Sequence, residues 1–225
     1  MTLQKVSVLG GTGDLGFALA TRWAQAGLEV IIGSRETERA KKAAERLLGI
    51  LPDANVQGLE NPAAAAASPV VVVTVPFSGF LAIYKSIADH IKPDAVVVDA
   101  TVPVEASLGG KATRVFGIWE GSAAQMALTV LPKGTKMCAA FHTLAAGAVG
   151  DPDQSVDGDV LVCGSKDGKG SVRELVELVP NLRFVDAGPL ENARIIEPIT
   201  ALLIGINHRY KTDRAGIRIT GLPDI

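Results

Sequence analysis

Residues 5–16 read KVSVLGGTGDLG, a short apolar run that leads directly into Gly11-Thr12-Gly13-Asp14-Leu15-Gly16. Glycines at this spacing are typical of a dinucleotide-binding turn between a strand and a helix. We expect Gly11 to allow the tight turn, Gly13 to let the backbone approach a pyrophosphate, and Gly16 to let the helix pack on the strand. The helix predicted over residues 14–27 would direct its free N–H groups and positive dipole end at that pyrophosphate.

The context of the glycines strengthens this interpretation, because a glycine-rich turn alone is a weak signal. The turn follows a strand-like run, opens an amphipathic segment, and is followed by a second strand predicted over residues 28–33. A strand-helix-strand unit of this kind favours a nucleotide site over a merely structural turn.

Composition limits the class of protein. The chain has 225 residues, of which 48% are hydrophobic and 20% charged, as in an ordinary globular protein of one large domain or one domain with a small appendage. Its formal net charge is −2 and it has no basic run, which argues against a nucleic-acid partner.

Cysteine usage and hydropathy point to a cytoplasmic protein with no membrane partner. Cys138 and Cys163 lie in apolar runs without metal-ligand spacing, so we interpret them as reduced core thiols rather than a disulfide or redox pair. No signal peptide precedes the first strand, and the longest apolar stretches, residues 68–77 and 199–206, are too short to span a bilayer.

Strands alternate with helices along the first two-thirds of the chain, which predicts an α/β fold with a doubly wound, Rossmann-type parallel sheet. Further strands are predicted at residues 55–58, 70–75, 95–100, 136–141, 158–164 and 183–187. Helices are predicted at residues 36–48, 63–67, 77–91, 122–131 and 170–179, with an open loop over residues 105–121. The apolar segment 189–210 has helical spacing, and Pro198 should interrupt it.

Ligands bind at the carboxyl ends of the strands in this architecture. We therefore expect Val75 and Pro76, after one central strand, and Val102 and Pro103, after the next, to line the cofactor crevice.

The end of the second strand selects the dinucleotide. An NAD-binding protein usually has Asp or Glu there to bind the ribose hydroxyls, whereas this chain has Ser34 and Arg35. A hydroxyl and a guanidinium can bind a 2′-phosphate through charge-assisted hydrogen bonds, which favours NADP. Arg39 and Thr12 are expected to contribute, although Arg35 and Arg39 could instead be solvated residues at a helix start.

Candidates for acid–base catalysis are few. His90 and His208 lie near predicted helix ends and are expected at the surface, whereas His142 follows an apolar strand, as a site residue or a satisfied core histidine would. We find no nucleophile elbow, no paired carboxylates with an obvious role and no metal-ligand cluster in the sequence. Hydride transfer to an acceptor that needs little protonic help fits this inventory.

Later motifs add a family resemblance that covers nearly the whole chain. These motifs are Thr101-Val102-Pro103-Val104, Gly121-Ser122-Ala123-Ala124, Phe141-His142-Thr143-Leu144, Val162-Cys163-Gly164, Asp186-Ala187-Gly188-Pro189-Leu190 and Asn192-Ala193-Arg194. With the glycine turn and Gly33-Ser34-Arg35, they resemble the NADPH-dependent reductases of coenzyme F420, also called F420H2:NADP oxidoreductases. Asp99-Ala100-Thr101 departs from this family, in which Ser-Pro-Leu is found at that place.

The resemblance implies reversible hydride transfer between nicotinamide C4 of NADP(H) and C5 of the deazaflavin F420. It implies that Thr12, Ser34, Arg35 and Arg39 hold the 2′-phosphate. It also implies a deazaflavin pocket formed by His142, Leu144, Val102, Pro103, Pro189 and Leu190. Residues 1–142 would form the NADP-binding domain, residues 143–225 a smaller α/β portion that closes the cleft, and two copies a homodimer.

Two alternatives stay open from the sequence. One is an NADP-dependent reductase of another small acceptor, such as an imine, a ketone or a flavin. The other is a catalytically silent NADP-sensing module that binds a protein partner, which the missing catalytic acid and the apolar segment 189–210 would suit.

Overall fold

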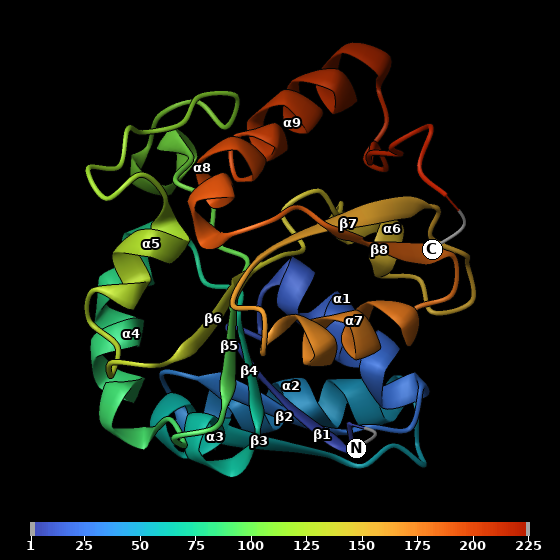
Figure 1. The fold of residues 1–225 in the computed structure, drawn as a ribbon. Coiled ribbons are helices and arrows are strands. Elements are labelled where there is room, and N and C mark those ends of the chain that lie inside the picture. The colour runs from blue at the N-terminus through green and yellow to red at the C-terminus, as the bar shows by residue number, and fades with distance from the viewer. Residues whose placement is uncertain (1–2, 224–225) are drawn as a thin grey trace.

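The apolar runs of the sequence become the strands of one sheet. In the computed structural model, which describes residues 3–223, eight strands form a sheet in the order β3-β2-β1-β4-β5-β6-β7-β8 (Figure 1). The strands are β1 (Lys5–Leu9), β2 (Glu29–Ser34), β3 (Val56–Glu60), β4 (Val70–Val73), β5 (Val96–Asp99), β6 (Lys136–Ala139), β7 (Gly158–Gly164) and β8 (Leu182–Asp186).

Helices cover both faces of this sheet. They are α1 (Asp14–Gln25), α2 (Thr37–Ile50), α3 (Asn61–Ala67), α4 (Phe80–Ile87), α5 (Ala123–Leu128), α6 (Ala146–Val149), α7 (Lys169–Glu177), α8 (Ala193–Ile196) and α9 (Ile199–Tyr210). Buried side chains of α1, α2 and α7 form one core cluster with one face of the sheet, and those of α3, α4, α5 and α8 form a second cluster with the other. The predicted doubly wound α/β fold is therefore confirmed.

The central strands owe their position to continuous β-branched runs. Every residue of β4 and of β5 is buried, and β4 pairs in parallel with both β1 and β5. A strand covered on both faces needs apolar side chains, which is the pattern of β4 and of β5 up to the buried Asp99 at its end.

The direction of β7 differs from the predicted parallel sheet. β7 runs antiparallel to β6, with Cys138 opposite Gly164, and β8 runs parallel to β7. The connection from β6 to β7 stays at the carboxyl end of β6 and contains only the four-residue α6, which packs on α1. Without a crossover to the other end of the sheet, the next strand has to return in the opposite direction.

Two irregular segments were partly predictable. Pro198 separates α8 from α9, as expected. The predicted open loop at residues 105–121 instead has contacts: Val115 bridges Val104, and the Phe116 N–H donates to the Pro103 carbonyl at 2.7 Å. No helix within residues 3–223 is long and apolar enough to cross a membrane.

Candidate functional site

The glycine turn lies at the carboxyl end of β1, between β2 and β4, where the order of the sheet reverses. Gly10 has a φ of +83°, so this residue makes the tight turn that the sequence assigned to Gly11. Gly11 is constrained by packing, because a Cβ there would lie 2.9 Å from the Val8 carbonyl oxygen. The turn therefore requires two glycines, Gly10 for its backbone conformation and Gly11 for its close packing.

The start of α1 packs directly against this turn. A Cβ on Gly16 would lie 2.7 Å from the Gly10 carbonyl oxygen, so only glycine permits this approach. Gly13 is exposed at the helix N-cap, followed by the exposed Asp14 and the half-buried Leu15. The first N–H groups of a helix have no partner within it, so they are available to an anion at this end.

The segments that follow β4 and β5 lie beside the turn. A Cβ on Gly10 would lie 3.0 Å from a methyl carbon of Val75, and Pro76 beyond it is exposed. The Thr101 hydroxyl donates to the Val75 carbonyl at 3.4 Å and so joins the two strand ends. Val102 is half-buried and Pro103 buried in the segment that follows.

Two unpaired guanidinium groups lie after β2, one directly beyond the strand and one in the first turn of α2. Ser34 is the last residue of that strand and is buried, whereas Arg35 and Arg39 are exposed and pair with no carboxylate of the described residues. The Gly10 N–H donates to the Gly33 carbonyl at 3.2 Å, which fixes this corner beside the glycine turn and the half-buried Thr12. The arrangement leaves both cations free for an anionic ligand.

His142 follows β6 in a strained segment. Phe141 precedes it with a φ of +70°, which is rare for an aromatic residue, and packs edge-on against Trp23 with ring centroids 5.7 Å apart. The Thr200 hydroxyl of α9 donates to the His142 carbonyl at 2.7 Å, and the Thr143 hydroxyl to the Asp159 carbonyl at 3.0 Å. The backbone around His142 is thereby fixed from two sides.

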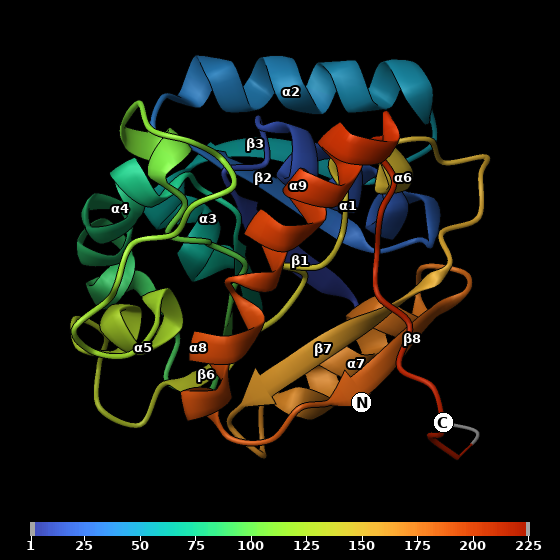
Figure 2. The ribbon, with the colours of Figure 1, turned by 90° about the horizontal axis from the view of Figure 1, so that it is seen from above.

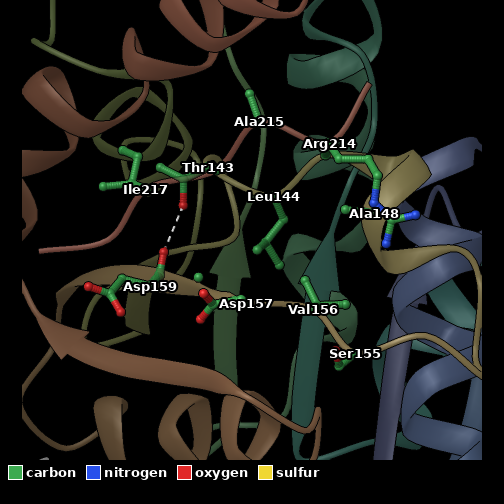
Figure 3. Close-up of a pocket in the computed structure, with 13 residues that line it drawn as sticks. Thr143, Leu144, Ala148, Ser155, Val156, Asp157, Asp159, Arg214, Ala215 and Ile217 are labelled. Carbon is green, nitrogen blue, oxygen red and sulfur yellow. Dashed lines mark hydrogen bonds between the residues drawn. The ribbon is translucent and has the colours of Figure 1, made fainter. Parts of the chain in front are cut away.

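A cavity of about 250 Å³ lies next to this segment. Leu144 points into it, and its walls come from residues 143–148, residues 155–159 and residues 214–217 (Figure 3). The buried Arg22 holds the neighbouring loop, since its guanidinium donates to the carbonyls of Val149, Asp151, Pro152 and Gln154. The cavity wall therefore depends on a side chain from the last turn of α1.

The structure does not bring all the residues predicted for the acceptor pocket together. Leu144 packs against the core cluster on the α1 face of the sheet, whereas Leu190 packs against the cluster on the opposite face and Pro189 is exposed. None of Val102, Pro103 or His142 lines the cavity. Pro189 and Leu190 are separated from Leu144 because β8 ends beside Gly164, on the far side of β7.

One group of polar residues was missed at the sequence level. Asp99, His142 and Glu197 are all buried, and each provides one ligating atom within 4.8 Å of the other two. Burial raises the pKa of Asp99 to about 7 and that of Glu197 to about 8, and it lowers the pKa of His142 to about 3. The sequence did carry a signal for this group: Asp99 is a single carboxylate at the end of an apolar run, and Glu197 is a single carboxylate within another.

The site has two defining features. Its glycine cradle lies where the order of a mostly parallel sheet reverses, and two free guanidinium groups follow the neighbouring strand β2. Together they define a Rossmann-type dinucleotide-binding protein.

The family model described as NADP oxidoreductase, coenzyme F420-dependent, matches residues 5–103. The F420-dependent NADP reductase of Methanothermobacter thermautotrophicus is 46% identical over 99% of this chain and 97% of its own length. That of Methanothermobacter marburgensis is 45% identical over 98% of this chain and 100% of its own length. The chain belongs to the family of coenzyme F420-dependent NADP oxidoreductases.

Solved structures extend the likeness of the fold. A crystal structure from Arthrobacter sp. FB24, described as that of an F420-dependent NADP-reductase, superposes with a TM-score of 0.81 at 22% identity, covering 97% of this chain and 99% of that one. A reductive aminase from Aspergillus terreus has a TM-score of 0.59 at 17% identity, with coverages of 94% and 63%.

Proposed function

We propose that this protein transfers a hydride reversibly between NADP(H) and the deazaflavin coenzyme F420. The reacting atoms would be C4 of the nicotinamide and C5 of the deazaflavin, and the bound cofactors supply the hydride chemistry itself. Membership of the family supports this choice, together with the name F420-dependent NADP reductase that its relatives carry.

The glycine cradle is the observation that carries the cofactor part of the proposal. A side chain at Gly16 would collide with the turn, while Gly13 and the start of α1 stay open to solvent. Ser34, Arg35 and Arg39 fit a 2′-phosphate, because two free guanidinium groups replace the carboxylate that would repel one. Gly11, Thr12 and Leu15 would complete the contacts of the turn.

The remaining residues would orient the two rings and exclude water. Val75, Pro76, Val102 and Pro103 occupy the ends of β4 and β5, where apolar side chains would shield the reacting atoms. Leu144 would contact the acceptor from the cavity that it lines. His142, two residues before it, would pack near the acceptor. Pro189 and Leu190 have the least structural support among the residues predicted for the acceptor pocket, because Leu190 packs on the opposite face of the sheet from Leu144.

The same proposal divides the chain by role. Residues 1–142 would bind NADP(H), and residues 143–225 would complete the acceptor pocket, since the cavity walls come from this second part.

We also propose a cytoplasmic homodimer. Support comes from the two free, buried cysteines and from α8 and α9, whose Ile195 and Leu202 are 60% and 63% exposed. Sedimentation of the protein, with Leu202→Glu compared with the wild type, tests the association.

A spectroscopic assay tests the reaction. The protein is mixed with NADPH and oxidised F420, and the visible absorbance of the deazaflavin is followed while NADPH binding is measured separately. We expect bleaching that is reversed by excess NADP⁺. Intact NADPH binding without bleaching would refute the proposal, and imine, ketone and flavin acceptors would then be assayed in its place.

A further inference from the structure

Three segments that are distant in the sequence bring polar side chains to one buried point. Asp99 ends β5, His142 follows β6, and Glu197 lies between α8 and α9. The exposed fractions of the three residues are 0%, 3% and 1%. Burying two carboxyl groups beside an imidazole is costly unless hydrogen bonds or protons compensate them.

Part of this group has no hydrogen-bond partner within the described chain. Both ring nitrogens of His142 are buried and unpaired, and Oδ2 of Asp99 has no partner apart from the nearby Thr101, whose hydroxyl and N–H oppose the rise that burial causes in the pKa of that carboxyl group. The other atoms are satisfied: Oδ1 of Asp99 accepts from the Tyr84 hydroxyl at 2.8 Å, and the oxygens of Glu197 accept from the N–H groups of Ala123 and Ala124 at 2.8 and 3.1 Å. A neutral imidazole has one donor and one acceptor, so the unpaired atoms are those of an incomplete network.

The geometry indicates what completes the network. Three atoms that are pairwise within 4.8 Å all lie within about 2.8 Å of a common centre, which is the length of a hydrogen bond from a water molecule. A metal cation fits less well, because it would stand against the two N–H groups at the start of α5 that already bind Glu197.

We propose that Asp99, His142 and Glu197 form a hydrogen-bond network through one internal water molecule, which pairs one ring nitrogen of His142, and that the two carboxyl groups are positioning residues for that imidazole. Tyr84 anchors one end of the network through Asp99, and the start of α5 anchors the other through Glu197. The network fixes the tautomer and the ring plane of His142. The backbone of the same residue is held by Thr200, so the segment that leads to Leu144 is fixed as a whole.

The consequence for the reaction rests on the proposed function. If Leu144 contacts the acceptor, loosening His142 changes the shape of the acceptor pocket and leaves the glycine cradle intact. Loss of one buried hydrogen-bond partner is expected to raise the KM for the deazaflavin about tenfold, while the KM for NADPH changes less than about twofold.

The tautomer and the protonation state of His142 can be measured directly by NMR in the full-length protein. The protein is labelled with ¹⁵N-histidine, and the signals of His142 are identified by their loss in His142→Asn. In the wild type we expect one neutral tautomer whose imidazole gains no second proton between pH 5 and pH 8, because burial lowers the pKa of His142 to about 3. Asp99→Asn and Glu197→Gln should mix the tautomers and raise the KM for the deazaflavin. The matched controls Asp94→Asn and Glu191→Gln, both at exposed carboxylates, should do neither.

Several results would overturn the network. One is a wild-type His142 whose imidazole gains a second proton between pH 5 and pH 8; this measurement needs no variant. A second is a tautomer that stays unchanged in both carboxamide variants. A third is stoichiometric binding of Co²⁺ that is lost in His142→Asn, which would make the group a metal site. The NMR readout needs no turnover, so a wild type with an ordered His142 but no F420 reduction would refute the proposed function and leave the network standing.

Discussion

The phenolic oxygen of Tyr84 lies 2.8 Å from Oδ1 of Asp99, and neither side chain reaches solvent. Burial, and then the neighbouring carboxyl group of Asp99, raises the pKa of Tyr84 well above its usual value, so the hydroxyl keeps its proton and remains the donor. This contact links α4 to the carboxyl end of β5. Figure 2 shows α4 beside α3 and α5, the helices with which it packs.

Tyr84→Phe should lower the free energy of unfolding by about 1–3 kcal/mol, because Oδ1 of Asp99 loses its donor in a buried position. Urea denaturation measures the change. Tyr210→Phe removes a hydroxyl from a residue that is 73% exposed and should change stability by less than about 0.5 kcal/mol. Equal effects of the two substitutions would contradict the buried contact.

Asp99→Asn should flatten the pH dependence of stability between about pH 4 and pH 7. Burial raises the pKa of Asp99 from 3.8 to about 7 in the folded protein, so the folded state holds a proton that the unfolded state releases. Stability from this group is therefore complete below pH 3.8 and is lost as the pH rises through about 7. The variant should gain stability relative to the wild type, by up to about 4 kcal/mol, over this range. Parallel profiles for the two proteins would be inconsistent with the shifted pKa.

Gly16→Ala should weaken NADPH binding more than about tenfold and lower stability by about 1–3 kcal/mol, because the new methyl group meets the turn at Gly10. Gly49→Ala is the matched control. That residue lies within α2 with open space around it, so alanine should stabilise the protein by about 0.5–1 kcal/mol. Calorimetric titration and thermal unfolding distinguish the two outcomes.

Arg35→Asp should weaken NADPH by about ten- to a hundredfold and NADH far less, because only NADPH has the 2′-phosphate that the guanidinium would bind. Lys42→Asp, an equal change of charge further along α2, should leave the ratio of the two affinities near its wild-type value. An equal loss for both cofactors in Arg35→Asp would remove the argument for a phosphate site.

His142→Ala should chiefly impair binding of the acceptor, raising the KM for the deazaflavin about tenfold while kcat falls less. Steady-state rates at saturating NADPH measure both constants. Total loss of hydride transfer at saturating concentrations of both ligands would instead assign His142 a proton-transfer role.

The sequence was sufficient for the sheet and for the glycine cradle because both depend on local patterns. Continuous β-branched runs located β4 and β5, and the spacing of the glycines located the turn. The reversal of β7 was not predictable in the same way. An apolar run specifies that a strand is buried but not the direction in which it enters the sheet, which depends on the connection at α6.

The cluster of buried polar residues around His142 could not be predicted from the sequence, for a different reason. Asp99 and Glu197 are separated along the chain by most of the second half of the fold, and only the packing of α8 against the sheet brings them together. A carboxylate inside an apolar run does indicate a paired or functional position. Its partner can be found only once the helices are placed.

The wall of the cavity formed by residues 214–217 has a consequence for the order of events during synthesis. These residues are held to β7 by a hydrogen bond of 2.7 Å from the Asp159 N–H to the Ile217 carbonyl. They leave the ribosome long after the glycine turn, which belongs to the first strand and helix to emerge. The residues of the cradle are therefore synthesised before those that close the cavity beside Leu144. Trp23 of α1 packs on Phe141 and donates to the Leu175 carbonyl, so the helix that starts at the cradle completes its packing only when these later segments have emerged.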